Sequence, residues 1–457
     1  MSSQHFACES ILQTAQCRLN VSLPGGFLNS QSTRVRYVVL FGLCLAAGLA
    51  YIHRGCLGVV GSTVQEDLDV SERALGWAFA LFFWSYALFQ IPAGLLVDRI
   101  GARRSLFAFG LLGAITIAIS AGKLLTDAAT GFAILLLART LMGIAQAGLF
   151  PASTRAMSVW IPLKFRASAA GMLQACMSLG GALGAFMTAR LMGVVSWPWI
   201  FLIYAIPGLI WSAWFFAWYR DRPDQHGSTN EAERRLLEQP ASKVSQPRGE
   251  WLVALTSLPV ILLCAQQFFR AGASSFWFSW CPKYLMKAHG LEKESAGELT
   301  SLPIFGFMIG SIGGGIVADW LFHRTGSKRI SRCGTAIGST FLGVICFLLT
   351  FLLHNFGTSV AVVFLVAGAM LAAGGNSSAY SVAMDLGGRN LAAVFGAMNM
   401  FGNFGAALFS QVAPEWVDWF GWPAIVLLVG GSYSIGMLLW LPLKPDSNAS
   451  RPKQANS

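Results

Sequence analysis

Charged residues are scarce in this sequence. They make up 12% of its 457 residues, with only 21 Asp and Glu and six His, whereas an ordinary soluble domain carries about 25% charged residues. This composition argues against a soluble globular chain. The six His are widely separated, and no metal-binding or Ser/His/Asp arrangement stands out, so a membrane enzyme is disfavoured and no cofactor is expected.

Cysteine motifs and a signal peptide are also missing. The nine Cys are scattered, mostly within apolar runs, with neither metal-ligand spacing nor a disulfide framework. We interpret them as small buried apolar residues. Residues 1–33 lack a basic start followed by an apolar core, so we expect a cytoplasmic tail there rather than a signal peptide.

The positive net charge does not indicate nucleic-acid binding. The formal charge is +11, but no basic stretch is interleaved with aromatic residues in the way that single-strand binding requires. In a membrane protein, excess Lys and Arg are concentrated in cytoplasmic loops. The expected partner is therefore the lipid bilayer.

Long apolar runs are the main feature that the sequence does contain. Hydrophobic residues make up 55% of the chain, and runs of roughly 20 such residues are typical of membrane helices. We predict an all-α integral membrane protein with twelve transmembrane helices. The spans lie near residues 37–60, 74–97, 105–125, 131–152, 167–190, 198–219, 252–280, 299–321, 333–354, 358–380, 391–413 and 422–443.

The charge of the loops predicts the orientation. Loops near residues 99–104, 155–166 and 324–332 are basic, and the alternate loops near 66–72 and 415–418 are acidic. Because basic loops stay in the cytoplasm, both termini should be cytoplasmic. The charged loop 220–250, with a short helix expected near 230–238, separates two blocks of six spans, and the predicted units are 1–33, 34–219, 220–250, 251–444 and 445–457.

One motif occurs twice, six spans apart. Two small residues precede Asp98 and a basic turn, and the same arrangement precedes Asp319 and a second basic turn. Such a repeat indicates a parallel duplication. On this motif the chain resembles the major facilitator superfamily from about Arg34 to Pro445. The resemblance implies two pseudo-symmetric six-helix bundles around a central cavity that opens alternately to each side. The second copy departs from the family pattern at Trp320, where a basic residue is usual.

The resemblance also implies that this motif takes part in gating. A carboxylate at each position can pair with loop arginines or a helix terminus and hold the cytoplasmic side shut. The alternative is that these loops only fix the topology. The expected gating residues are Asp98, Arg99, Arg103, Arg104, Asp319 and Arg324.

Rows of glycine suggest close helix contacts. Gly180 and Gly184 lie one turn apart in the fifth span, and Gly306, Gly310 and Gly314 form a similar row in the eighth. Small residues at this spacing allow helix backbones to approach closely. Tight static packing and a sliding surface both remain open.

Three arginines lie inside predicted spans. Arg54 and Arg139 lie on the order of 10 Å below the outer edge, and Arg270 occupies the position in span seven that Arg54 occupies in span one. We expect Arg54 and Arg270 to face each other across the pseudo-twofold axis. Arg at a bilayer centre costs ~2.5–3.5 kcal/mol or more. Since the spans hold few acids, a bound anion should supply the counter-charge, and a carboxylate suits the planar fork of Arg. A structural role is the alternative for each arginine.

Further motifs resemble those of the anion:cation symporter family. They are Tyr51-Ile52-His53-Arg54, the run from Phe82 to Pro92, the run from Trp280 to Leu285, and Gly396-Ala397-Met398-Asn399. That family includes bacterial sugar-acid transporters, sialin and the vesicular glutamate transporters. The resemblance implies substrate-binding roles for Arg54 and Arg139, and it matches Arg270 to an arginine of the vesicular glutamate transporters. Polar residues expected to bind substrate, or else to join helices, are Tyr86, Gln90, Gln146, Gln174, Asn399 and Asn403.

Two positions depart from the proton-coupled members of that family. They carry an acid before the first-helix arginine and a Glu seven residues after the fourth-helix arginine. Here these places hold His53 and Gln146. Gln146 cannot titrate, and the positive charge of Arg54 disfavours protonation of His53. Coupling to H⁺ through His53, coupling to Na⁺ or another ion, and uncoupled or exchange transport all remain open.

The sequence therefore predicts a monomeric secondary transporter for a small organic anion. The predicted substrate is a carboxylate such as a sugar acid or dicarboxylate, and the predicted location is the inner membrane. A uniporter or exchanger, a carrier of neutral sugars or drugs, and a non-transporting sensor are the alternatives. The neutral carrier leaves the three buried arginines without a role.

Overall fold

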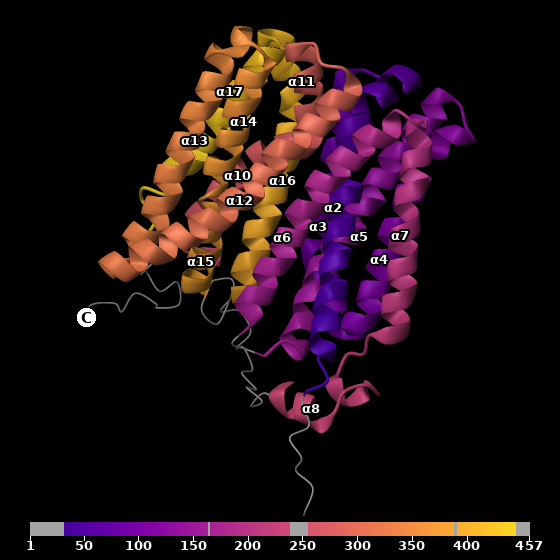
Figure 1. Ribbon diagram of the computed structural model, residues 1–457, viewed down its shortest axis with the longest axis vertical. Coiled ribbons are helices and arrows are strands. Elements are labelled where there is room, and N and C mark those ends of the chain that lie inside the picture. The colour runs from indigo at the N-terminus through magenta and orange to yellow at the C-terminus, as the bar shows by residue number, and fades with distance from the viewer. Residues whose placement is uncertain (1–31, 163–164, 238–254, 388–390, 445–457) are drawn as a thin grey trace, which may run out of the picture.

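The structure is a bundle of long helices. A computed structural model describes residues 32–162, 165–237, 255–387 and 391–444 (Figure 1). Every regular element within these ranges is helical, and nine of the helices are long and apolar enough to cross a membrane. Residues 1–31 of the predicted N-terminal tail, the start of span seven, residues 238–250 of the predicted central loop and the predicted C-terminal tail lie outside the described residues.

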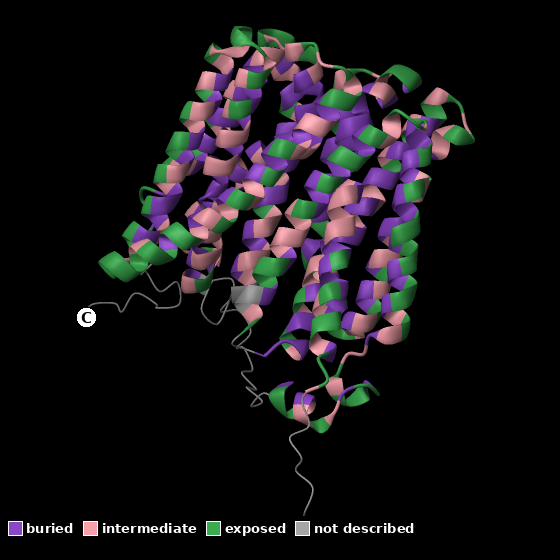
Figure 2. Ribbon diagram, in the orientation of Figure 1, coloured by how far each residue is buried: buried purple, intermediate pink, exposed green. Residues whose placement is uncertain are grey.

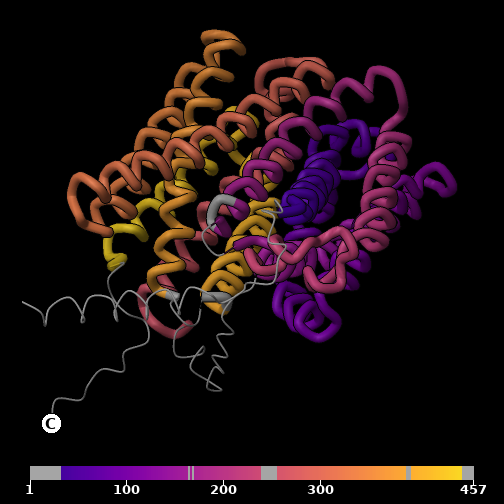
Figure 3. The backbone as a smooth tube through the Cα atoms, turned by 60° about the horizontal axis from the view of Figure 1, so that its bottom comes forward, coloured from indigo at the N-terminus to yellow at the C-terminus, as the bar shows by residue number. Residues whose placement is uncertain are grey.

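The first six spans form one bundle. Figure 3 shows it beside the second bundle, and Figure 2 shows buried residues on the inner faces of the helices and exposed ones on the outer faces, as expected where lipid surrounds the protein. The spans are α2 (Val35–Leu68), α3 (Glu72–Ile100), α4 (Ala102–Ile119), α5 (Ala128–Trp160), α6 (Arg166–Met192) and α7 (Trp197–Trp218).

The last six spans form the second bundle, and two of them are each built from two helices. Pro282 follows the break in span seven, where its missing N–H and its ring favour a new helix start. Gly374 and Gly375 mark the break in span ten. The helices are α10 (Leu258–Ser279), α11 (Cys281–His289), α12 (Lys293–Thr325), α13 (Thr335–Leu352), α14 (Thr358–Ala373), α15 (Asn376–Gly387), α16 (Leu391–Phe420) and α17 (Ile425–Leu438). The twelve-span, two-bundle prediction is confirmed.

The helix α2 is longer than the apolar run from which it was predicted. It continues past Val60 through Gln65 and Glu66 and ends at Leu68. About 20 Å of helix therefore follows Arg54, rather than the expected 10 Å. The run in the sequence ends where polar side chains begin, but the backbone hydrogen bonds of the helix continue beyond that point.

The predicted glycine rows pack helices within a bundle. Gly180 lies against Gly48 on α2 so closely that a Cβ atom would not fit, and Gly310 lies equally close to Met370 on α14. A different glycine, Gly58 on α2, lies against the backbone of Phe278 on α10 and so joins the two bundles. In this structure both predicted rows pack helices within a bundle, and the sliding role stays a prediction.

The bundles are joined by ion pairs at the end opposite to α8 (Glu231–Leu237), which we call the far end; the other is the α8 end (Figure 1). Within the described residues, five ion pairs cross between the bundles. They are Lys283–Glu72 at 3.0 Å, Lys293–Glu66 at 2.5 Å, Arg73–Glu415 at 2.8 Å, Arg73–Asp418 at 3.1 Å and Arg190–Glu298 at 2.5 Å. All five lie at the far end.

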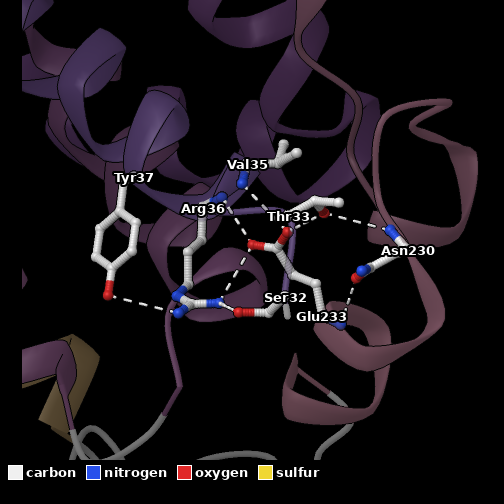
Figure 4. Close-up of polar contacts among 7 residues, drawn as sticks. All are labelled: Ser32, Thr33, Val35, Arg36, Tyr37, Asn230 and Glu233. Carbon is white, nitrogen blue, oxygen red and sulfur yellow. Dashed lines mark hydrogen bonds and ion pairs between the residues drawn. The ribbon is translucent and has the colours of Figure 1, made fainter. Parts of the chain in front are cut away.

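The helix α8 forms at the place predicted for a short helix and is attached to the first bundle. Glu233 is fully buried and accepts hydrogen bonds from the backbone N–H groups of Val35 and Arg36, at 3.2 and 3.1 Å, and from the side chain of Thr33 (Figure 4). Its carboxylate also pairs with the Arg36 guanidinium at 3.3 Å. A carboxylate at this place satisfies free N–H groups of α2 and complements the helix dipole.

Candidate functional site

A small pocket lies in the first bundle beside Arg54. From Arg54 it follows α2 and α5 toward the α8 end. Arg54 carries the single charge in its lining, which consists of Ala47, Ala50, Tyr51, Arg54, Tyr86, Gln146, Leu149, Phe150, Ser153, Leu173 and Met177. A charged residue in an otherwise uncharged pocket points to a ligand of opposite charge.

The guanidinium of Arg54 is surrounded by aromatic rings. Its Cζ atom lies 4.5 Å from the ring centre of Tyr51, 4.8 Å from that of Phe82 and 5.4 Å from that of Tyr86. Each such contact contributes about 0.5–2 kcal/mol, but an aromatic ring does not neutralise a full charge. The Nε atom is buried and has no hydrogen-bond partner among the described residues.

Gln146 is the hydrogen-bond partner of Arg54. The Nη2 group of Arg54 donates to Oε1 of Gln146 at 3.1 Å. The Nε2 group of Gln146 donates to the carbonyl oxygen of Ala50 at 3.0 Å, which holds the amide oxygen toward Arg54. The partner that the fold provides for this cation is thus neutral.

Arg139 lies behind the pocket and is 2% exposed. Its Nε group donates to the carbonyl oxygen of Ala78 at 3.2 Å, and its Nη1 group contacts the sulfur of Met142 at 3.6 Å. Its Cζ atom lies 4.9 Å from the ring centre of Phe82, the same ring that contacts Arg54. The structure therefore brings the two predicted arginines to one aromatic ring, but it places only Arg54 in the pocket lining.

Arg270 reaches the same region from the second bundle. It is 8% exposed, and its Nε group donates to Oε1 of Gln267, one turn earlier on α10, at 2.9 Å. Tyr51, Tyr380 and Tyr433 lie within electrostatic range of it. Because Tyr51 also contacts Arg54, the two arginines approach a common residue from opposite bundles, in line with the expected pseudo-twofold relation.

The expected polar residues of the site bind one another across the two bundles. Asn399 on α16 donates to Oε1 of Gln90 on α3 at 2.7 Å, and Gln174 on α6 donates to the hydroxyl of Tyr380 on α15 at 3.2 Å. Asn403 instead donates to the backbone oxygen of Asn399 within α16. In this conformation these amides join helices, which is the alternative role expected for them.

His53 lies outside the pocket lining. It is 5% exposed, and its Nε2 atom lies 2.9 Å from the carbonyl oxygen of Tyr204 on α7. Since a carbonyl only accepts, Nε2 carries the proton in this contact. The imidazole therefore faces α7, whereas its neighbour Arg54 faces the pocket.

The residues of the repeated motif lie at the α8 end and make their contacts within a bundle. Asp98 pairs with Arg155 on α5 at 2.8 Å. Arg103 donates twice to the carbonyl oxygen of Phe216, which fixes α4 to the end of α7. Arg99, Arg104 and Asp319 are exposed, and Arg324 lies over the ring of Trp320 at 5.0 Å. Their gating role stays a prediction.

Sequence reasoning missed several residues around the arginines. Phe82 contacts two guanidinium groups, Gln267 binds Arg270, and Tyr433 bonds to Ser274 at 2.9 Å beside Arg270. The spacing of Gln267 and Arg270 by three residues was a usable signal, because such residues share a helix face. Phe82 begins one of the runs that carry the family resemblance, but nothing in the sequence marked it, among 33 Phe, as a contact of two arginines.

Two six-helix bundles, with a charged pocket in the first and Arg270 reaching toward it from the second, are typical of a transporter of the alternating-access class. Residues 43–410 match the Major Facilitator Superfamily, and the chain belongs to this family. It is a multi-pass membrane transporter and not an enzyme.

Similar proteins are named as transporters of acids. The chain is 26% identical to the probable galactarate/D-glucarate transporter GudP of Escherichia coli strain K12, over 81% of this chain and 84% of that protein. It is 30% identical to the D-galactonate transporter of Escherichia coli O6:H1, over 68% of this chain and 74% of that protein. Among solved structures, a bacterial homologue of the human lysosomal transporter Spinster, inward-facing and unoccupied, has a TM-score of 0.68 at 17% identity, covering 89% of this chain and 94% of that chain. The last comparison concerns the fold alone.

Proposed function

We propose that this protein carries a small organic anion, a sugar acid or a dicarboxylate, across the inner membrane by alternating access. The observation that carries the proposal is the state of Arg54. Its guanidinium faces a pocket, its hydrogen-bond partner is the neutral Gln146, and its buried Nε group has no partner among the described residues. A substrate carboxylate provides both the charge and the acceptor atoms that this group lacks.

The other two arginines act with Arg54 in this proposal. Arg270 closes the site from the second bundle, where Tyr380 and Tyr433 add hydroxyl groups for the polar part of the substrate. Arg139 raises the positive potential of the site from behind Phe82. The names of the relatives support a sugar acid, since GudP and the D-galactonate transporter are named for such molecules.

We assign the α8 end to the cytoplasm, because the basic loops lie there. The pocket then spreads from Arg54 toward the cytoplasm, while the five ion pairs close the outer side. This is an inward-facing arrangement, with bundles proposed at residues 34–219 and 251–444. One chain supplies both walls of the site, so the proposed transporting unit is the monomer.

A thermal-shift screen tests the substrate class. Purified protein is heated with D-galactonate, D-glucarate and succinate, and with D-galactose as the neutral counterpart of D-galactonate. We expect a raised Tm with one or more of the acids and none with D-galactose, because a ligand that binds the folded state stabilises it. Stabilisation by D-galactose alone would instead support a neutral-sugar carrier.

A further inference from the structure

The three arginines of the site, of which Arg139 and Arg270 are buried and Arg54 is partly buried, have only neutral hydrogen-bond partners. Arg54 donates to an amide of Gln146, Arg139 to a backbone carbonyl and a thioether, and Arg270 to an amide of Gln267. The described part of the chain therefore holds three guanidinium charges around the site with no carboxylate in contact with any of them. The site has a strong net positive charge when it is empty.

Acids do occur on the helices that line the pocket, but they lie at helix ends and have other partners. Glu66 pairs with Lys293, Glu72 with Lys283 and Asp98 with Arg155. The titratable groups that face Arg54 are the phenols of Tyr51 and Tyr86, and His53 faces α7. No described group at the site is a carboxyl that could lose a proton to compensate for Arg54.

This charge affects the step in which the protein passes from one open side to the other. An alternating-access carrier must close both sides around the site, and closure removes the water that solvates the guanidinium groups. An uncompensated buried cation is costly, whereas a cation paired with an anion is much less so. A site with a carboxylate beside the arginine can compensate by deprotonating when it is empty, but Gln146 has no such proton to lose.

We propose that this protein is an obligate anion exchanger. Its binding site passes from one side of the membrane to the other only when it holds an anion. Under this scheme one organic anion leaves for each that enters. The inference rests on the proposed function. Of the coupling mechanisms left open by the sequence, it selects exchange. Under this proposal neither H⁺ nor Na⁺ is transported with the substrate.

Counterflow in proteoliposomes tests the inference. Purified full-length protein is reconstituted, and uptake of radiolabelled D-galactonate and of D-glucarate is measured into vesicles preloaded with the same unlabelled acid and into vesicles that hold only Hepes and KCl, with valinomycin to clamp the voltage. We expect initial rates at least tenfold higher into preloaded vesicles. An imposed pH or Na⁺ gradient should not raise uptake into the vesicles that hold only Hepes and KCl.

The outcomes separate the two proposals. Equal rates into preloaded and unloaded vesicles would overturn exchange and leave the transport function intact. Absence of uptake into both kinds of vesicle, for both acids, would overturn the proposed function and the exchange with it.

The variant Gln146→Glu provides a second test. It adds a titratable carboxyl next to Arg54, so the empty site can become compensated, and we expect proton-driven uptake into unloaded vesicles. Gln146→Met is the matched control, since it removes the amide without adding a charge, and it should still require preloading. Net uptake by Gln146→Met at the rate of its own counterflow would contradict the inference. So would a folded Gln146→Glu protein that exchanges but shows no net uptake.

Discussion

Arg54 and Gln146 form a contact between a cation and a neutral amide at the centre of the site. The Nη2 group of Arg54 lies 3.1 Å from Oε1 of Gln146, and the other side of the amide is held by the carbonyl oxygen of Ala50. This geometry fixes where the guanidinium points without neutralising it. The charge therefore remains available to a substrate.

Arg139 should act through its charge rather than by touching the substrate. It is buried against Ala78 and Phe82 and is not part of the pocket lining. We expect Arg139→Lys, which keeps the charge, to bind D-galactonate within about threefold of the original protein, and Arg139→Met to lose about tenfold, or about 1.4 kcal/mol. Titration calorimetry of both variants measures this. An equal loss in the two variants would show that the planar fork itself is required.

Lys283 should hold the far end closed. Its side chain is 4% exposed, it pairs with Glu72, and it also donates to Gln65. We expect Lys283→Met to open this end, because it leaves Glu72 without its partner between the bundles. The readout is labelling of the buried Cys281 by a membrane-impermeant maleimide, measured by mass spectrometry, and we expect at least a fivefold faster rate.

Arg73→Gln is the matched control for this experiment. Arg73 also joins the bundles, through Glu415 and Asp418, but its side chain is 60% exposed. Exposed ion pairs contribute about 0–1 kcal/mol, so the labelling rate should change less than twofold. If Arg73→Gln opened the far end as much as Lys283→Met, burial of the Lys283–Glu72 ion pair would not be what keeps the far end closed.

Glu233 should couple the central loop to the first bundle. Its carboxylate accepts from two backbone N–H groups at the start of α2 and pairs with Arg36. We expect Glu233→Gln to lower the free energy of unfolding by roughly 1–3 kcal/mol, since hydrogen bonds to a charged group are lost. Faster hydrogen exchange in residues 223–237 would confirm undocking. The exposed Glu231 offers a control, and Glu231→Gln should leave exchange there unchanged.

His226 should make the docking of this loop sensitive to acid. Burial lowers the pKa of His226, with a further contribution from Arg220, while Glu233 acts in the opposite sense. Because the folded-state pKa lies below the unfolded value of about 6.5, the contribution to stability is full above that pH and is lost as pH falls toward the folded pKa. We expect faster exchange in residues 223–237 at pH 5.5 than at pH 7.5. His226→Gln should remove that difference, and a difference that persisted would assign the effect to another group.

Much of the fold was predictable because lipid restricts the sequence strongly. Each span needs a long apolar run, so the twelve spans could be read from the sequence, and buried charges are rare enough for Arg54, Arg139 and Arg270 to stand out. The length of α2 was not predictable from its apolar run, because Gln65 and Glu66 remain helical after the run ends.

The contacts of the site were less predictable because they depend on how each helix is rotated. One residue along a helix turns a side chain by about 100°, which is enough to direct His53 toward α7 while Arg54 faces the pocket. Contacts between distant segments, such as Glu233 with the start of α2, leave no periodic signal in either segment.

The most direct test of the whole account is D-galactonate and D-glucarate binding to the Arg54→Ala variant, measured by titration calorimetry beside the original protein. Arg54→Lys serves as the matched control that keeps the charge but not the planar fork. We predict that Arg54→Ala loses at least a hundredfold in affinity while its Tm without ligand stays within a few degrees of the original. Retained affinity for both acids in a folded Arg54→Ala protein would contradict the central claim that this guanidinium binds the transported anion.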